Sequence, residues 1–196
     1  MGFVTTLPRS RPLTRDDLDA MPDDGHRYEL IDGVLVVTPA PSWPHQRVVT
    51  RLLRLLDDAC PEGLEVLVAP FEVALAVDTV LQPDVLIARV ADLTFRDLPA
   101  APVLAVEVLS PSTRRVDLTL KRSRYEEAGC SSYWAVDPLE PALTAWDLSG
   151  DTYVEVGSVS GADSWQATLP FPVAVCPADL LSSRGGRLAQ GHPAAG

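Results

Sequence analysis

The stretch QPDVLIA, residues 82–88, decides the fold, because it places a carboxylate at the mouth of a buried strand. The continuous apolar run that follows Asp84 is typical of a strand covered on both faces. A charge at the start of such a strand is costly unless another group pairs with it. Two interpretations are open. Asp84 is either a turn residue that ends a loop, as Pro and Asp often are, or a metal ligand or catalytic acid.

A second apolar stretch, PVLAVEVLS at residues 102–110, contains one internal charge, Glu107. Side chains alternate along a strand, so Ala105, Glu107 and Leu109 share one face. Burial of a lone glutamate raises its pKa unless a cation compensates. Two carboxylates on neighbouring strands repel each other, and Mg²⁺, which is often held by one or two carboxylates plus waters, relieves that repulsion. A metal site at Asp84 and Glu107 is therefore the functional interpretation of the two stretches, and a turn residue at Asp84 remains the alternative.

The helix predicted over residues 114–129 carries Asp117, Lys121 and Tyr125 four residues apart on one face. One interpretation is a surface Asp–Lys pair beside a packing tyrosine. The other is a lysine projected towards the metal pocket. There its ammonium would orient the attacking water and offset negative charge in the transition state.

The net charge of the chain restricts the kinds of molecule that it can bind. The formal net charge of −11 argues against avid, non-specific binding of nucleic acid, which needs a basic surface. The same acidity suits a site that collects divalent cations. A local cluster around the predicted helix, with Arg114, Arg115 and Arg122, predicts contacts to backbone phosphates.

Length and cysteine content bound the organisation. The 196 residues, 46% of them hydrophobic, suffice for one substantial core. The three cysteines are far apart and not in metal-ligand spacing, which favours free thiols and a reducing cytoplasm. No apolar run approaches the roughly 20 residues needed to span a bilayer.

The order of elements predicts an α/β (α+β) fold with a mixed central sheet flanked by helices. An N-terminal hairpin with Asp32-Gly33 at its turn and a peripheral C-terminal hairpin complete it. We expect an extension with a short helix over residues 1–25, one domain over 26–180 and a disordered tail over 181–196. The elements expected are helices at 14–22, 45–60 and 114–129, hairpins at 27–41 and 142–159, and strands at 64–69, 71–77, 84–90, 102–110 and 131–138.

Together these stretches resemble a known superfamily. QPDVLIA, LAVEVLSPST and DLTLKRSRYEEAGCSSYWAVDP are similar to the PD-(D/E)XK nucleases, and more closely to the Uma-two family of restriction endonucleases (Uma2, DUF820-type). The upstream YELIDGVLVVTPAPSWPHQRVVTRLLRLL resembles the opening of the same family. The resemblance covers roughly residues 26–148, and it implies a restriction-endonuclease-like core.

Carried over by position, the resemblance implies that Pro83-Asp84 is the PD element and that Glu107 is the following acid. The superfamily's usual lysine lies two residues after that acid, where this sequence has Leu109. In the Uma-two arrangement the lysine lies on the next helix, at the position of Lys121. Glu29 matches an acidic residue near the same site; the alternative is an ordinary hairpin residue.

The activity that the resemblance implies is Mg²⁺- or Mn²⁺-dependent hydrolysis of DNA phosphodiester bonds by a cytoplasmic homodimer. Asp84 and Glu107 would bind the metal, with the backbone carbonyl of Val108 as a further ligand. Tyr125 and His45 are candidates for substrate contact, with capping or packing as the alternative for His45. The acidity and the missing strand lysine leave a second function open, a non-catalytic nucleic-acid-binding or protein-interaction module. RNA or another phosphodiester is a third possibility.

Overall fold

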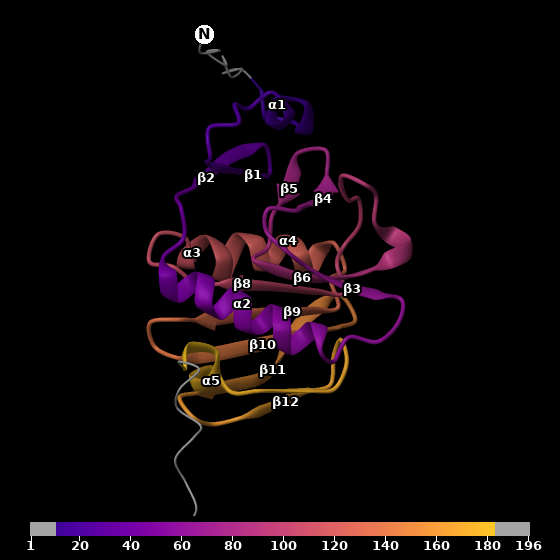
Figure 1. Cartoon of the computed structure of the whole chain (residues 1–196). Helices are drawn as coiled ribbons and strands as arrows, with labels where there is room; N and C mark the ends of the chain where they lie inside the picture. Colours follow the sequence, from indigo (N-terminus) through magenta and orange to yellow (C-terminus); the bar gives the residue numbers. More distant parts are fainter. Residues whose placement is uncertain (1–10, 183–196) are drawn as a thin grey trace, which may run out of the picture.

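In a computed structural model of the protein, which describes residues 11–182, a six-stranded mixed sheet forms the centre of the fold (Figure 1). The strand order is β11-β10-β9-β8-β6-β3, in which β8 and β9 are parallel and the other neighbours antiparallel. The predicted mixed central sheet is confirmed. Its strands are β3 (Leu64–Val68), β6 (Val85–Arg89), β8 (Leu104–Val108), β9 (Ser132–Asp137), β10 (Ala142–Ser149) and β11 (Thr152–Ser160).

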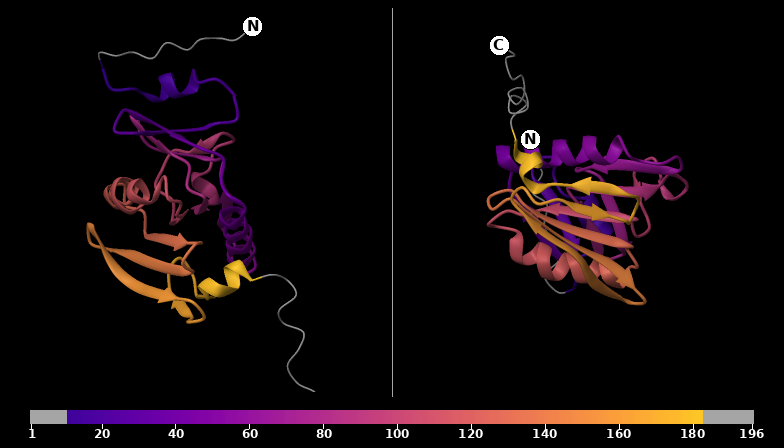
Figure 2. Two further views of the ribbon diagram at one scale, coloured as in Figure 1. Left: turned by 90° about the vertical axis from the view of Figure 1, so that its left-hand side faces the viewer. Right: turned by 90° about the horizontal axis from the view of Figure 1, so that it is seen from below.

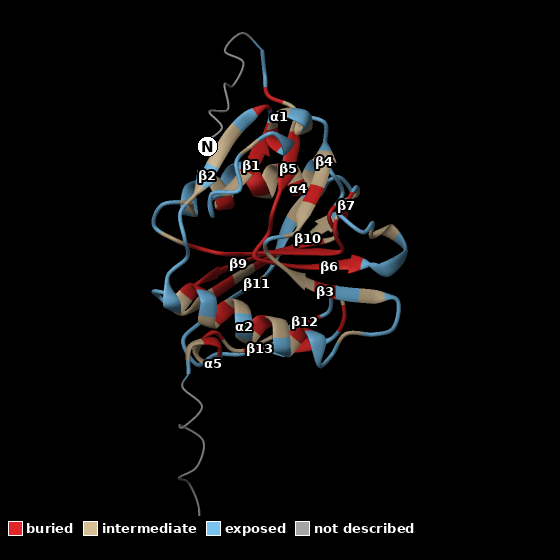
Figure 3. Ribbon diagram, turned by 45° about the horizontal axis from the view of Figure 1, so that its top comes forward, coloured by how far each residue is buried: buried red, intermediate tan, exposed pale blue. Residues whose placement is uncertain are grey.

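Helices cover both faces of this sheet, because its central strands are apolar on both sides (Figure 3). Val85 and Ile87 pack in one core cluster with the buried face of α2 (Trp43–Asp57). Leu86 points to the other face and packs in a second cluster with Tyr125. Viewed from below in Figure 2, α2 and the helical stretch after β8 lie on opposite sides of the sheet.

A second, five-stranded sheet has the order β2-β1-β5-β4-β7. The strand predicted at residues 71–77, to which the sequence assigns no partner, lies in this second sheet. The hairpin of β4 and β5 pairs with β1, where Leu30 stands opposite Val80. Hydrophobic periodicity predicts a strand but not its long-range partner. The strands are β1 (Arg27–Ile31), β2 (Val34–Thr38), β4 (Glu72–Ala76), β5 (Thr79–Leu81) and β7 (Asp97–Leu98).

The turn between β1 and β2 has the predicted form. Asp32 and Gly33 have φ values of 51° and 73°, the left-handed conformations that a tight hairpin turn requires. At Gly33 a Cβ atom would lie 2.4 Å from Cβ of Pro12, so the N-terminal segment also needs glycine there. The hairpin's first strand thereby has a fixed register, which sets the positions of Arg27 and Glu29.

The helix predicted over residues 114–129 is one helical stretch in three parts: α3 (Arg114–Val116), a π-helical turn η2 (Asp117–Lys121) and α4 (Arg122–Glu127). The remaining short elements are α1 (Arg15–Asp19), the 3₁₀ turn η1 (Val90–Asp92), β12 (Trp165–Ala167), β13 (Val173–Val175) and α5 (Pro177–Leu181).

The predicted C-terminal hairpin of residues 142–159 is the β10–β11 pair, which forms one edge of the central sheet. Leu181 ends α5, so the predicted tail over 181–196 begins inside a helix; residues 183–196 lie outside the described part of the chain. The division at residue 25 stays a prediction. Within residues 11–182 no helix combines the length and apolar character needed to cross a membrane.

Candidate active site

Asp84 and Glu107 come together because their strands are antiparallel neighbours. Val85 stands opposite Val106, and extending that register by one residue sets Asp84 opposite Glu107. The backbone N–H of Val108 donates a hydrogen bond of 2.8 Å to Oδ2 of Asp84, which ties the two strand ends together. Asp84, Glu107, Val108 and Ser110 line one cleft of about 350 Å³. The predicted juxtaposition of the two carboxylates is present.

Two basic side chains hold the carboxylate of Asp84. Arg27, from β1, donates to Oδ1 at 2.9 Å, and Nε2 of His45, in the first turn of α2, lies 3.1 Å from Oδ2. Burial raises the pKa of Asp84, but the hydrogen bonds and charges of His45 and Arg27 outweigh it and lower that pKa to about 2. Asp84 is therefore an ionised acceptor at neutral pH.

Glu107 has a different environment, in which three acids gather around one amine. Nζ of Lys121 lies 2.9 Å from Oε1 of Glu29, 3.1 Å from Oε1 of Glu107 and 3.6 Å from Oδ1 of Asp117. Burial raises the pKa of Glu107 well above its ordinary value, and the neighbouring carboxylates of Asp117, Asp84 and Glu29 add to this effect. Lys121 opposes it without cancelling it.

Lys121 is the only lysine in the sequence; all other cationic side chains are arginines. Burial lowers the pKa of its ammonium, but Glu107, Glu29 and Asp117 raise it further, so the amine is charged. A compact ammonium has three donors that can be aimed at three separate acceptors, whereas the planar guanidinium suits paired oxygens. This geometry explains why a chain that otherwise uses arginine has lysine here.

The π-helical turn η2 begins at Asp117 and ends at Lys121, and both residues are buried. Such turns insert an extra residue into a helical turn and are frequent at functional sites. Tyr133 also fixes this turn, since its hydroxyl donates to the backbone oxygen of Asp117 at 2.8 Å. The helix thus presents Lys121 to the sheet at the level of Glu107.

Glu29 lies behind the cleft, on the side of Lys121. Its Oε1 also accepts a hydrogen bond of 2.8 Å from the backbone N–H of Gln82, and its Oε2 has no hydrogen-bond partner in the described chain. Nε of Arg27 is 3.8 Å from that oxygen. Of the two interpretations of Glu29, an ordinary hairpin position does not account for its complete burial against a charged amine.

Two residues of the site were not among those predicted, Arg27 and Asp117. Arg27 was recognisable in principle, because alternation along β1 places it on the same face as Glu29. Asp117 was noted for its helical spacing to Lys121 but not assigned a role. Its pKa is raised, chiefly by burial, against the opposing charge of Lys121.

The remaining candidates lie elsewhere. Tyr125 is fully buried against Tyr133, with ring centroids 5.6 Å apart. Arg114 pairs with Asp137, Arg122 lies 4.9 Å from the ring centroid of Trp146, and Arg115 is exposed. None of Tyr125, Arg114, Arg115 and Arg122 is among the described residues that line the cleft of Asp84 and Glu107.

The donor set of the cleft fits a hard cation. The carboxylates of Asp84 and Glu107 supply oxygen atoms, Val108 lines the same cleft, and Mg²⁺ commonly takes one or two carboxylates and completes its shell with water. Within residues 11–182 no group of three or more His, Cys, Asp or Glu side chains is arranged to hold a metal ion.

Comparison with known proteins identifies the family. The family model described as “Uma2: Putative restriction endonuclease” matches residues 15–179. The chain belongs to the Uma2 family. No curated protein matches it. A solved structure described as a “putative nuclease belonging to DUF820” from Anabaena variabilis ATCC 29413 is similar, with 16% identity and a TM-score of 0.68. The match covers 87% of this chain and 98% of that one, and at this identity it shows a shared fold.

The Uma2 assignment confirms the family resemblance found in the sequence and supports nuclease function in general terms. Placed on this chain, the matched range includes the carboxylates of the cleft, Lys121 and the whole of α2. Leu109, two residues after Glu107, is buried in the core, and Lys121 from the helix lies beside Glu107.

Proposed function

We propose that this Uma2 protein is a Mg²⁺- or Mn²⁺-dependent endonuclease that hydrolyses phosphodiester bonds of DNA. One observation carries the proposal: Asp84 and Glu107, opposite each other on neighbouring strands, line one cleft, and the only lysine of the chain backs one of them. Buried charges need compensating partners, and clusters of buried titratable groups in a cleft are characteristic of functional sites.

The proposed metal ligands are Asp84, Glu107 and the backbone carbonyl of Val108. When bound, the cation would polarise the scissile phosphate and lower the pKa of a coordinated water. Arg27 and His45 orient Asp84 through its two oxygens. Outer partners of this kind orient metal ligands, and their loss typically reduces activity by about 10- to 100-fold.

Lys121 acts through Glu107 in this proposal. Its ammonium holds one oxygen of Glu107, while Glu29 and Asp117 hold the ammonium. The buried positive charge also favours the negative charge that develops on the phosphate in the transition state. The role of Lys121 in orienting the attacking water, which the sequence predicts, belongs to the same proposal.

A cleavage assay tests the proposal. Supercoiled plasmid DNA and an RNA of similar length are incubated with the purified protein in Mg²⁺, Mn²⁺ or EDTA. We expect nicking or linearisation of the DNA with either cation and none in EDTA. Asp84→Asn and Glu107→Gln should each reduce the rate by at least about 100-fold, as expected for loss of a ligand.

Asp97→Asn is the matched control, because Asp97 is also a buried carboxylate paired with an arginine, Arg15, but lies in the second sheet. It should cleave like the wild type. Cleavage that survives Asp84→Asn, or cleavage of RNA alone, contradicts the proposal.

One observation favours a second function, a non-catalytic nucleic-acid-binding or protein-interaction module. Each carboxylate of the cleft already has a basic partner in the protein, Arg27 for Asp84 and Lys121 for Glu107. Calorimetric titration with Mn²⁺ separates the two functions. The nuclease should bind the ion with a heat that Asp84→Asn abolishes, whereas the module should show no carboxylate-dependent binding.

We also propose a homodimer, since cutting both DNA strands calls for two sites, and a cytoplasmic location, with which the free thiols of Cys60, Cys130 and Cys176 are compatible. Size-exclusion chromatography with light scattering tests the first point. A mass near 21.1 kDa at every concentration contradicts it.

A further inference from the structure

The outer side of α2 carries an unusual concentration of positive charge. Arg47, Arg51 and Arg54 lie at helical spacing on one face, and with Trp43, Gln46 and Thr50 they line a shallow hollow of about 490 Å³. We refer to these six residues as the arginine face. No acidic residue occurs in α2 before Asp57, its last position.

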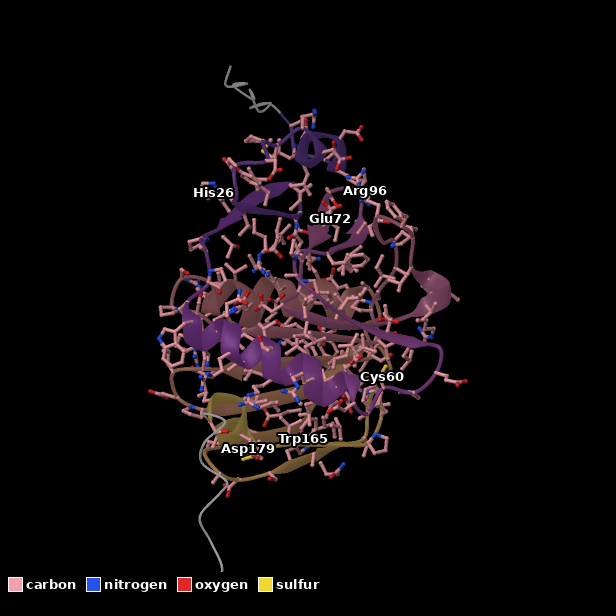
Figure 4. The ribbon with its side chains drawn as sticks, viewed as in Figure 1. His26, Cys60, Glu72, Arg96, Trp165 and Asp179 are labelled. Atoms are coloured by element: carbon pink, nitrogen blue, oxygen red, sulfur yellow. The ribbon has the colours of Figure 1, made fainter. Side chains whose placement is uncertain are left out.

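These three arginines lack the acidic partners that most others have. Within residues 11–182 no carboxylate lies within ion-pair distance of Arg47, Arg51 or Arg54. Arg96, by contrast, pairs with Asp19 and lies 3.7 Å from Glu72, which is labelled beside it in Figure 4. Other arginines with acidic partners are Arg11, Arg15, Arg27, Arg89, Arg114 and Arg124. In a chain of net charge −11, an unneutralised row of cations calls for an anionic partner.

The arginine face adjoins the candidate active site. Gln46 and Thr50 line both its hollow and a larger cleft of about 600 Å³, whose other lining residues include Arg27, His45 and Asp84. The first turn of α2 joins the two regions directly, since His45 is buried on Asp84 and Trp43, two residues earlier, is 72% exposed. A polymer with one unit at Asp84 can therefore continue over Gln46 and Thr50 onto the arginines.

The guanidinium groups are also partly pre-arranged. Arg47 lies 5.5 Å from the ring centroid of Trp43, and it donates one hydrogen bond to the backbone oxygen of Leu181. Arg51 donates one to the backbone oxygen of Ser182. Each guanidinium has five N–H donors, so these contacts fix its place and leave donors for another acceptor.

We propose that the arginine face binds the phosphodiester backbone of the DNA substrate on one side of the scissile phosphate, with Trp43 packed against a sugar or base at the border of the cleft. The inference rests on the proposed function, and it names the surface along which the DNA substrate would lie. Contacts of this type position a nucleic acid without reading its sequence. They also allow an acidic protein to bind DNA through a local surface.

Binding is measured without cleavage, by fluorescence anisotropy of a short labelled DNA duplex in EDTA at several salt concentrations. The variant R47Q/R51Q/R54Q should bind at least about tenfold more weakly than the wild type. Its plot of log affinity against log salt should lose about one unit of slope for each phosphate contact removed. The matched control is R89Q/R96Q/R124Q, which changes the net charge equally at arginines that have acidic partners and line neither the arginine face nor the two clefts.

Two further variants separate charge from folding. R47K/R51K/R54K keeps the charges and should retain the salt slope. R54Q alone removes an exposed guanidinium that forms no hydrogen bond within residues 11–182. Wild-type affinity in the arginine-face triple variant, an equal loss in the control, or no DNA binding by the wild type overturns the inference. Binding through the arginine face without metal-dependent cleavage leaves the inference standing and rejects the nuclease. Metal-dependent cleavage together with unchanged DNA binding in the triple variant supports the nuclease and overturns the inference.

Discussion

Asp84 and Glu107 are carboxylates that face each other across neighbouring strands, yet their surroundings drive their pKa values in opposite directions. Asp84 accepts hydrogen bonds from Arg27 and the backbone of Val108 and lies within hydrogen-bond distance of His45; its pKa is about 2. Glu107 shares its single amine with Glu29 and Asp117, and burial among these acids raises its pKa. Both acids are buried, yet their pKa values shift in opposite directions. Asp84 has several donors of its own, whereas Glu107 shares one amine with two other acids.

The difference indicates two roles within one cleft. Asp84 is a preformed anion that the fold stabilises in the absence of any ligand. Glu107 is a buried acid whose ionised form is destabilised by burial and by the neighbouring carboxylates, and a cation in the cleft would offset this destabilisation. Sites where neighbouring titratable groups are pushed apart in pKa are characteristic of catalysis, although structural ion pairs produce shifts as well. Stability measurements on single variants can therefore test the contrast without any substrate.

The largest effect is expected for Lys121→Met, which removes the amine that the three acids share. Breaking a buried ion pair from one side costs about 3–5 kcal/mol, because uncompensated charge stays buried. We expect a loss of that size in the free energy of unfolding, measured in urea at pH 7. The double variant K121M/E107Q should recover part of it, and a loss below about 1 kcal/mol, the size seen for exposed ion pairs, would show that the cluster is solvated.

Asp84→Asn should have an intermediate effect. The pKa of Asp84 is depressed from 3.8 to about 2, and at about 1.4 kcal/mol per pKa unit this is worth about 2 kcal/mol. The stabilisation is present above the ordinary pKa and is lost as the pH falls through the folded-state value. The difference in the free energy of unfolding between wild type and variant should thus be largest at pH 7 and shrink between about pH 4 and pH 2. A difference that does not change with pH would contradict the assignment.

Glu107→Gln should have the smallest effect and the opposite sign. Since the folded state raises the pKa of Glu107, its ionisation opposes folding above the ordinary pKa of 4.5. In EDTA at pH 7 the variant should be more stable than the wild type, by about 1 kcal/mol, as is common when a functional residue is replaced. The gain should vanish in acid. A loss of stability of Glu107→Gln at pH 7 would contradict the opposite pKa shifts assigned to Glu107 and Asp84.

Sequence reasoning reached the two carboxylates and the lysine because each is a polar residue at a position where apolar spacing predicts burial. The same reasoning placed Ala105 and Glu107 on one strand face, as the structure has them. It gave no indication of the π-helical turn. A helix with one inserted residue has almost the same hydrophobic pattern as a regular one.

Long-range pairing was beyond the reach of the pattern. The β4–β5 hairpin joins β1 rather than the central sheet, and this pairing brings Glu29 and Arg27 to the two carboxylates. Arg27 belongs to a strand that looks half-exposed in sequence, where an arginine is ordinary. Alternation along β1 groups Arg27 with Glu29, but its ion pair with Asp84 depends on how the loop before β6 folds against β1.

The central claim is that Asp84 and Glu107 share one divalent cation. Electron paramagnetic resonance of Mn²⁺ tests it directly, since the signal of free Mn²⁺ falls as the protein binds the ion. We predict one bound Mn²⁺ per chain for the wild type and for Asp97→Asn, and loss of that binding in both Asp84→Asn and Glu107→Gln. Binding that persists in both cleft variants, or that is absent from the wild type, would contradict the claim.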